Sequence, residues 1–438
     1  MFSSTIKKIK TRIDKEKINY FLMLFCVFLP FQFALNPREG IDLAIVRIII
    51  PLVFLIWMLS KFKNKERFFT CSTQTWLLLL FFFLAFFSLI FSSNISWSIR
   101  KLLFLLSIAP IYFISISVFK NDKLQRLILF SFIVGASLLS WVAILQFASQ
   151  FIFSIDHVYS FLANISPFFL GNSFSTAVLA YPSWLVNVGG ITYMRAIAVF
   201  PDPHMLSYYL EMLLPWSIAL WATTQKNRTW LLICVLSLLL ANILTFTRGS
   251  YIALIAGSLI VLPLVTKKTA LKIIIGAIFF LFLTTVTPHD PVTERLASSF
   301  DVQEGSNQER LSNWKQSLVI IANHPFGVGI GAYSLAVKST ANYREPIYAH
   351  NLYLDIAAEL GIFASLVFIA LLLTALKNFW IASKTQPFFI AGVASVIIFS
   401  VHSLVENPLF SVHVLPLFLI ILALSSSIKP NKENDVIK

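Results

Sequence analysis

Residues 75–93 read TWLLLLFFFLAFFSLIFSS, a stretch without one charged side chain. A helix needs about 20 mostly apolar residues to cross the hydrocarbon core of a bilayer. The rest of the chain is similar, because 58% of its 438 residues are hydrophobic and only 12% are charged. Soluble domains carry about 25% charged residues, so this composition excludes a soluble globular enzyme and indicates an all-α polytopic membrane protein.

Twelve apolar segments predict membrane-spanning helices, which places both termini on the same side of the membrane. The first segment is too long for the apolar part of a signal peptide, and no small-residue cleavage site follows it, so it is interpreted as a span. The predicted spans are 18–36, 41–60, 75–93, 98–119, 125–150, 204–223, 229–246, 249–265, 270–287, 352–376, 386–405 and 409–428.

Lysine and arginine gather at the N-terminus, in alternate connections and in the C-terminal tail. Basic residues mark the cytoplasmic side of a membrane protein, so both termini are predicted to be cytoplasmic. The net charge of +14 is thereby explained by orientation, and no nucleic-acid partner is expected. The basic stretches are 7–17, 61–67, 120–126, 226–228, 267–272, 377–384 and 429–438.

This topology divides the chain into seven parts. Connections longer than about 15 residues are usually functional, so chemistry is expected in the two long outer, periplasmic loops. The parts are a cytoplasmic basic N-terminus (1–17), spans one to five (18–150), a periplasmic loop with an interfacial helix (151–203), spans six to nine (204–287), a large periplasmic catalytic loop bearing short helices (288–351), spans ten to twelve (352–428) and a cytoplasmic tail (429–438).

The predicted outer side favours arginine over lysine, whereas the cytoplasmic side does the reverse. A planar guanidinium grips phosphate or carboxylate oxygens with two hydrogen bonds, so this bias points to an anionic ligand. Pairing of these arginines with nearby acidic residues is the alternative reading. The seven histidines also fall on the outer side, but no H-E-x-x-H or D-x-D spacing is present, and the three cysteines show no metal spacing. No metal and no other cofactor is therefore expected.

Three arginines stand in segments that could hold an anion. Arg248 lies between two apolar runs with almost no loop, where it either snorkels to the interface or binds an anion. Arg310 opens an amphipathic segment, where its charge adds to the positive end of the helix dipole and suits a phosphate. Arg195 precedes Phe200-Pro201-Asp202-Pro203-His204, which reads as a turn and a helix start, so it is either an anion ligand or part of that turn.

Two further motifs lie near the end of the second long loop. The segment 326–331, Phe-Gly-Val-Gly-Ile-Gly, resembles a phosphate-binding loop in spacing only and is interpreted as a turn that shapes the loop. His350 falls where the chain enters the membrane again, so it is either a helix cap or a base for a hydroxyl group near neutral pH. Asp355 or Glu359 would then orient its ring.

The ordered set of motifs resembles the O-antigen ligase / O-antigen polymerase superfamily of membrane glycosyltransferases. The resemblance covers roughly residues 195–365 and is carried by an ordered series of segments, with the twelve-span layout behind it. The segments are Thr247-Arg248-Gly249-Ser250, Arg310 with Trp314, His324-Pro325-Phe326-Gly327-Val328-Gly329, His350-Asn351-x-Tyr353 and Glu359-x-Gly361.

The resemblance implies a GT-C-like inverting enzyme of the bacterial inner (cytoplasmic) membrane, with its active site on the periplasmic face and no metal. Its donor would be a glycan linked to undecaprenyl pyrophosphate, and its acceptor a hydroxyl of the lipid A-core or of another lipid-linked glycan. The matching positions imply that Arg248 and Arg310 bind the pyrophosphate and that His350 acts on the acceptor hydroxyl. The predicted substrate-binding residues are Arg195, Trp314, Arg344, Asn351 and Tyr353.

Within this superfamily the sequence favours an O-antigen ligase. A polymerase of O-antigen or exopolysaccharide and a protein O-oligosaccharyltransferase remain open, since all three share the donor and the leaving group. A transporter of lipid-linked oligosaccharide is the alternative from another class. It is disfavoured because no inverted repeat or pair of broken helices is seen, and the polar groups gather on one side rather than at mid-membrane.

Overall fold

The computed structural model describes residues 16–38, 40–65, 72–119, 121–180, 183–225, 227–264, 266, 291–298, 305–343 and 347–428. Within these ranges the chain is mostly helical, and the strands form two antiparallel hairpins, β1–β2 and β3–β4. After a helix at 16–28, the elements are β1 (Ala34–Arg38), β2 (Ile41–Ala44), α2 (Val46–Lys63), α3 (Thr73–Phe87), η1 (Ser88–Phe91), α4 (Ile95–Ile108), α5 (Pro110–Val118), α6 (Asp122–Phe153), α7 (Ile155–Leu170), α8 (Asn172–Ala180), β3 (Leu185–Val188), β4 (Ile191–Met194), α9 (Pro203–Thr223), α10 (Arg228–Ile243), α11 (Arg248–Val261), η2 (Leu262–Leu264), α13 (Pro291–Ala297), α14 (Gly305–Asn323), α15 (Tyr333–Val337), α16 (Leu352–Leu360), α17 (Ile362–Ser383), η4 (Pro387–Phe389), α18 (Ile390–His402) and α19 (Val414–Ser427).

Several helices are long and apolar enough to cross a membrane. In the described part of the chain four meet this criterion at full length, at Thr73–Phe91, Ile95–Val118, Asp122–Phe153 and Ile362–Ser383. Shorter apolar helices lie at Arg228–Ile243, Arg248–Leu264, Pro387–His402 and Val414–Ser427. An all-α membrane protein is thereby confirmed. The count of twelve spans stays a prediction, and the expected span 270–287 falls outside the described residues.

The outside of the bundle is strongly apolar. On α3, for example, Trp76, Phe83 and Phe86 each expose more than 60% of their surface. A soluble protein rarely leaves so many large apolar side chains in contact with water, whereas lipid chains accommodate them at little cost.

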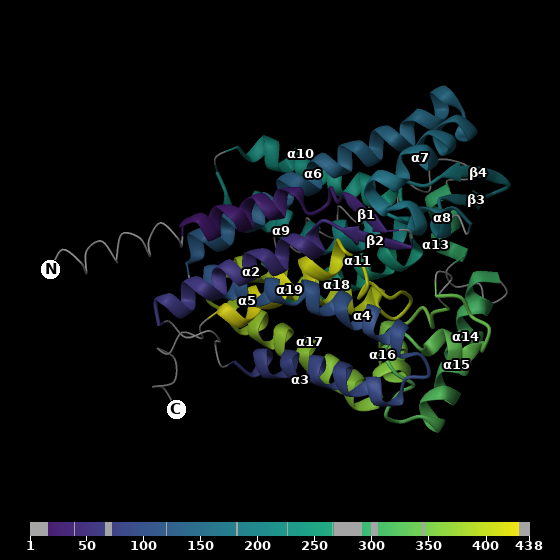
Figure 1. The fold of residues 1–438 in the computed structure, drawn as a ribbon. Helices are drawn as coiled ribbons and strands as arrows, with labels where there is room; N and C mark the ends of the chain where they lie inside the picture. The colour runs from purple at the N-terminus through teal and green to yellow at the C-terminus, as the bar shows by residue number, and fades with distance from the viewer. Residues whose placement is uncertain are drawn as a thin grey trace.

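The core is built around α9, α18 and α19, most of whose residues are buried. Helix α9 packs against α6, α10 and α18, and α18 also packs against α11. Figure 1 shows α9, α11, α18 and α19 in the middle of the bundle, with α7, α8, α13, α14, α15 and the hairpin β3–β4 gathered at one end. We call this end of the molecule the loop end.

Two predicted spans differ from the helices that form. The expected span 18–36 is helical only as far as residue 28, and Ala34–Arg38 then pairs with Ile41–Ala44 as a hairpin. The expected span 98–119 is divided at Pro110 into α4 and α5. Proline has no backbone N–H and its ring clashes with the preceding turn, so an uninterrupted helix is disfavoured there.

Residues 151–203 contain more structure than the single interfacial helix that was predicted. Helix α6 continues to Phe153, and α7, α8 and the hairpin β3–β4 follow it. Apolar side chains of this segment form a small core of their own around Trp184, whose indole N–H donates to the carbonyl of Pro201 at 2.8 Å. The segment therefore folds as a unit at the loop end, and we call residues 151–203 the cap.

Helix ends meet below this cap. Helix α9 begins at Pro203 and α11 begins at Arg248, while α18 ends at His402. Asp202 caps α9 by accepting a hydrogen bond from the backbone N–H of Met205 at 2.9 Å. The first turns of α9 and α11 carry partial positive charge, so this junction favours an anion.

Candidate functional site

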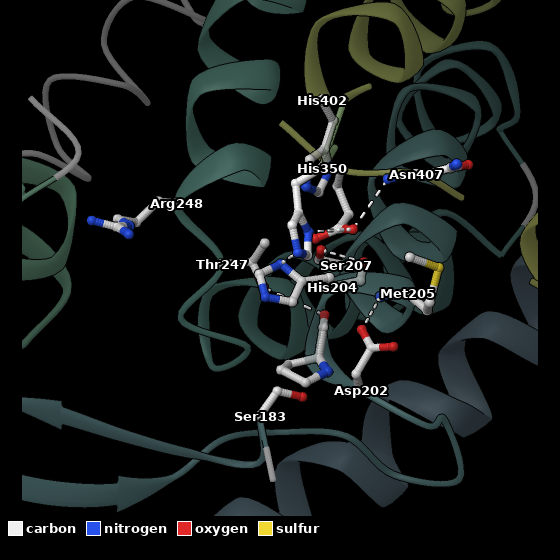
Figure 2. Close-up of polar contacts among 12 residues, drawn as sticks. Ser183, Asp202, His204, Met205, Ser207, Thr247, Arg248, His350, His402 and Asn407 are labelled. Atoms are coloured by element: carbon white, nitrogen blue, oxygen red, sulfur yellow. Dashed lines mark hydrogen bonds and ion pairs between the residues drawn. The ribbon is translucent and has the colours of Figure 1, made fainter. Parts of the chain in front are cut away.

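A cavity of about 180 Å³ opens at the junction of these helix ends. It contains four arginines and two histidines but no acidic side chain among its described lining residues. The lining residues are Arg195, His204, Arg248, Gly249, Arg295, Ser306, Arg310, His402 and Val405. Figure 2 shows His204, His350 and His402 on one side and Arg248 on the other. We call this cavity the arginine cavity.

Arg248 is buried and held by hydrogen bonds at the wall of the arginine cavity. Its side chain is only 6% exposed, and its guanidinium donates to the carbonyl of Ser298 at 3.0 Å and to the hydroxyl of Ser306 at 3.0 Å. Because Arg248 opens α11, its charge lies at the positive end of that helix. Arg310 also donates to Ser306, at 3.3 Å, so one serine hydroxyl joins both guanidiniums.

Arg195 has a different environment from the other two predicted arginines. It is 4% exposed, and its guanidinium donates to the carbonyls of Thr245 at 2.7 Å and Ser183 at 3.1 Å and to the hydroxyl of Thr247 at 3.1 Å. These bonds tie the cap to the turn before α11, so Arg195 shapes the cavity wall as well as lining it. Burial and the neighbouring Arg295 lower the pKa of Arg195 to about 9, which still leaves it charged at neutral pH.

His350 stands beside the arginine cavity, next to a carboxylate that the sequence analysis did not predict. Its Nδ1 lies 3.4 Å from Oε1 of Glu406, and Oε2 of the same carboxylate lies 3.8 Å from Nδ1 of His204, which lines the cavity. Glu406 thus connects His350 to the cavity wall. The side chain of His350 is 37% exposed, so a substrate has access to it.

The ionisable side chains around His350 and Glu406 shift one another's pKa values. Glu406 raises the pKa of His350, while burial of the imidazole works in the opposite direction. Burial alone would raise the pKa of Glu406, but the charges of His350, His204 and Arg310 hold it well below its usual range. Burial and the charge of Glu406 raise the pKa of Asp202 to about 6. An ionised Glu406 accepts hydrogen bonds only, so Nδ1 of His350 carries a proton and Nε2 is left to act as a base.

Asp355 and Glu359, the two carboxylates expected to orient His350, form hydrogen bonds and an ion pair elsewhere. Asp355 accepts hydrogen bonds from the backbone N–H of Ala349 at 2.8 Å and from the side-chain amide of Asn407 at 2.9 Å. Glu359 forms an ion pair with Lys101 at 2.8 Å. The orienting carboxylate is therefore Glu406, and Asp355 instead fixes the backbone on either side of the pair.

Asn351 and Tyr353, which were predicted to bind substrate, form hydrogen bonds within the protein. Asn351 caps α16 by accepting from the backbone N–H groups of Tyr353 and Leu354, both at 3.1 Å, and its amide donates to the carbonyl of Leu404 at 3.0 Å. The hydroxyl of Tyr353 donates to the carbonyl of Ser400 at 2.9 Å. Neither residue lines the arginine cavity. They hold the turn that carries His350, whose own φ of +50° is a strained conformation for a side chain with a Cβ.

Trp314 and the glycine segment are not among the described lining residues of the cavity. Trp314 on α14 does not line it, and its indole N–H has no hydrogen-bond partner among the described residues. Arg344 falls outside the described residues. The glycine segment forms a tight turn against α16, because the backbone N–H groups of Val328 and Gly329 donate to the carbonyls of Ala358 at 2.8 Å and Glu359 at 2.9 Å. These amides are used internally, which agrees with a turn and not with a phosphate loop.

Besides Glu406, four residues at the site were not predicted from the sequence as functional, namely Arg295, His204, His402 and Glu211. Arg295 and His204 line the cavity, but Arg295 was only one of many outer arginines and His204 was read as part of a turn. His402 lines it as well, with Nδ1 held 2.7 Å from Oε1 of Glu211. A histidine and a glutamate inside apolar runs were the available signals, since ionisable residues at such positions are uncommon.

A comparison with known protein families finds a match for the part of the chain that supplies several of these residues. Residues 232–369 match the family model described as O-antigen ligase. This segment is therefore similar to the O-antigen ligase family. It contributes Arg248, Arg295, Arg310 and His350, whereas His204, His402 and Glu406 come from outside it.

A curated protein from Acinetobacter baylyi resembles part of the chain. It is described as a ComP-specific O-oligosaccharyltransferase and is 30% identical over 187 residues, which cover 39% of this chain and 33% of that protein. The chain thus spans a third of the relative it matches. Both comparisons indicate similarity to glycosyltransferase-like membrane enzymes and confirm the superfamily to which the sequence motifs pointed.

Proposed function

We propose that this protein transfers a complete glycan from undecaprenyl pyrophosphate to a sugar hydroxyl of the lipid A-core, as an O-antigen ligase. The observation that carries the proposal is the arginine cavity, where four guanidiniums converge within reach of an oriented histidine. A lipid-linked pyrophosphate is a polyanion, and a cavity of this composition supplies the charge that its departure requires without a metal ion.

The proposed reaction is one direct displacement. The acceptor hydroxyl attacks the anomeric carbon while Nε2 of His350 accepts its proton, and the bond between that carbon and the pyrophosphate oxygen breaks. The electron pair of the broken bond goes to the pyrophosphate, whose added negative charge the guanidiniums of Arg248 and Arg310 stabilise. Attack opposite to the leaving group inverts the anomeric configuration.

We also propose the membrane arrangement in which this reaction takes place. The chain crosses the bacterial inner membrane twelve times with both termini in the cytoplasm, and the loop end faces the periplasm. The distribution of lysine and arginine supports this orientation. The loops 151–203 and 288–351 then recognise the acceptor, and the arrangement as a whole is GT-C-like.

The test is to incubate purified protein with a pyrophosphate-linked glycan in the presence of a chelator, offering a lipid A-core acceptor. Mass spectrometry identifies the molecule that carries the glycan. Arg248→Ala is the site variant, and Lys315→Ala, an exposed cation on α14, is its matched control. We expect glycan on the lipid A-core, a loss of roughly a hundredfold with Arg248→Ala, and little change with Lys315→Ala. Longer glycan still on the carrier would identify a polymerase and contradict the proposal.

A second candidate is protein O-glycosylation, which the Acinetobacter relative favours by its description. It shares the donor, the arginine cavity and the base, and it differs only in the hydroxyl that attacks. An acceptor protein such as ComP, offered in the same assay, distinguishes the two. Glycan on the protein and none on the lipid A-core would assign this chain to the second activity.

A further inference from the structure

A second histidine–glutamate pair lies inside the helical core beside the arginine cavity. His402 ends α18 and Glu211 lies within α9, and Nδ1 of the histidine is 2.7 Å from Oε1 of the glutamate. Both side chains are 0% exposed. Burying two ionisable groups is costly, so a pair at this depth calls for an explanation beyond stability.

The ring of His402 is held in one orientation. It stacks on Tyr208 with 3.9 Å between ring centroids and an angle of 4° between the planes. On its other side lies Gly249, where an added Cβ would come within 2.6 Å of Cδ2 and 2.8 Å of Nε2 of the imidazole. The absence of a side chain at Gly249 therefore leaves the space that this ring needs.

The remaining nitrogen of this ring has no partner in the protein. Nε2 of His402 is buried and makes no hydrogen bond to any described residue, although the residue lines the arginine cavity. Buried polar atoms are nearly always satisfied, and an exception in a fixed ring at a cavity wall points to a ligand that supplies the missing contact. The arginines around it make that ligand an anion.

We propose that His402 is a ligand of the pyrophosphate leaving group, donating a hydrogen bond from Nε2, while Glu211 acts as a positioning residue that holds the ring through Nδ1. The inference rests on the proposed function and adds a fifth hydrogen-bonding group to the four guanidiniums. As the sugar–oxygen bond breaks, its electron pair passes to the pyrophosphate, and the hydrogen bond from His402 strengthens with the added charge. The proton stays on Nε2, and no bond to the protein forms.

The groups around His402 fix its ring beside the cations of the cavity. Glu211 holds Nδ1, so the ring keeps one orientation at the cavity wall. The groups facing it are Tyr208, Glu211 and His204 on α9, Arg248 on α11, Arg310 on α14, Arg295 on α13 and Arg195 before α9.

The experiment measures the affinity of the purified full-length protein for inorganic pyrophosphate by titration calorimetry. His402→Asn keeps an amide near the position of Nδ1 and removes Nε2. We expect its Kd to be roughly tenfold weaker than that of the wild type at the same pH, because one hydrogen bond to the anion is lost. Equal Kd values would overturn the proposal.

Two further variants separate a ligand from a merely structural histidine. His413→Asn is the matched control, because His413 is 1% exposed, stacks on Phe200 and does not line the cavity, and we expect it to leave the Kd unchanged. Glu211→Gln keeps the size of the side chain and removes its charge, so it should weaken pyrophosphate binding by less than His402→Asn does. Thermal unfolding in detergent shows that each variant folds.

The outcomes separate this proposal from the one on which it rests. If the wild type binds pyrophosphate and Arg248→Ala weakens binding, but His402→Asn binds as the wild type does, His402 is not a ligand and the arginine site stands. If the wild type binds no pyrophosphate at millimolar concentration, the anion site and the role of His402 are both wrong.

Discussion

Two histidine–glutamate pairs at the loop end are built in opposite ways. His350 and Glu406 lie on connections, 3.4 Å apart, with 37% and 12% of their side chains exposed. His402 and Glu211 lie on packed helices, 2.7 Å apart and fully buried. A group that exchanges protons with a substrate needs access, whereas a group that holds a leaving group needs a fixed position. The exposed pair is suited to the first task and the buried pair to the second.

The largest effect is expected from removing the exposed histidine. His350→Ala should lower kcat by roughly 10³-fold, because the acceptor hydroxyl loses its base. Its Kd for pyrophosphate should stay within about twofold of the wild-type value, since a general base contributes to the chemical step rather than to ground-state binding. Glycan-transfer rates and calorimetry measure the two quantities. His157→Ala, an exposed histidine on α7, is the control, and a parallel loss of pyrophosphate affinity in His350→Ala would contradict the division of tasks.

The next effect concerns the carboxylate of the exposed pair. Glu406 raises the pKa of His350, so Glu406→Gln should lower that pKa and keep the imidazole neutral at lower pH. The acidic limb of the profile of kcat/KM against pH should therefore move to lower pH, while the plateau falls about tenfold because the ring loses its partner. Glu309→Gln on α14 should leave the profile in place. An unmoved limb would show that His350 does not set it.

A substitution at Gly249 tests the buried pair without changing His402 or Glu211. Gly249→Ala would place a Cβ 2.6 Å from Cδ2 of His402, so the ring must shift and the affinity for pyrophosphate should fall about fivefold. Gly257→Ala, on the same helix, would crowd Ile398 of α18 at 2.6 Å, away from the cavity. Both substitutions should lower the free energy of unfolding by about 1–3 kcal/mol. Equal affinities in the two variants would indicate that the position of the ring is unimportant.

The sequence predicted those parts of the molecule that depend on local pattern. Apolar segments indicated an all-α membrane protein, and the bias toward arginine identified Arg195, Arg248 and Arg310, which the structure brings to one cavity. Their roles stay predictions. The hairpin at Ala34–Ala44 was missed because its two ends were included in the predicted spans 18–36 and 41–60, where hydropathy alone does not distinguish a short strand from the end of a helix.

The two pairs could not be predicted, because tertiary packing creates them. Glu211 and His402 are 191 residues apart in sequence and meet only because α9 packs on α18. Glu406 sits in a short connection with no motif around it, and Asp355 and Glu359, which are closer to His350 along the chain, were the natural candidates. Proximity in sequence favoured them, but the turn at His350 directs its ring toward the end of α18 instead.

The smallest effect distinguishes a cap from a substrate ligand at Asn351. Asn351→Ala removes two hydrogen bonds to the first turn of α16 and should cost about 1 kcal/mol of stability, with a fall in kcat of only about threefold as the turn of His350 loosens. Asn351→Asp keeps the accepting oxygen and should recover most of the lost stability. Because a cap acts through the backbone, KM for the acceptor should be the same in both variants. A rise in KM with unchanged Tm would instead make Asn351 a substrate ligand and place the acceptor beside the exposed pair.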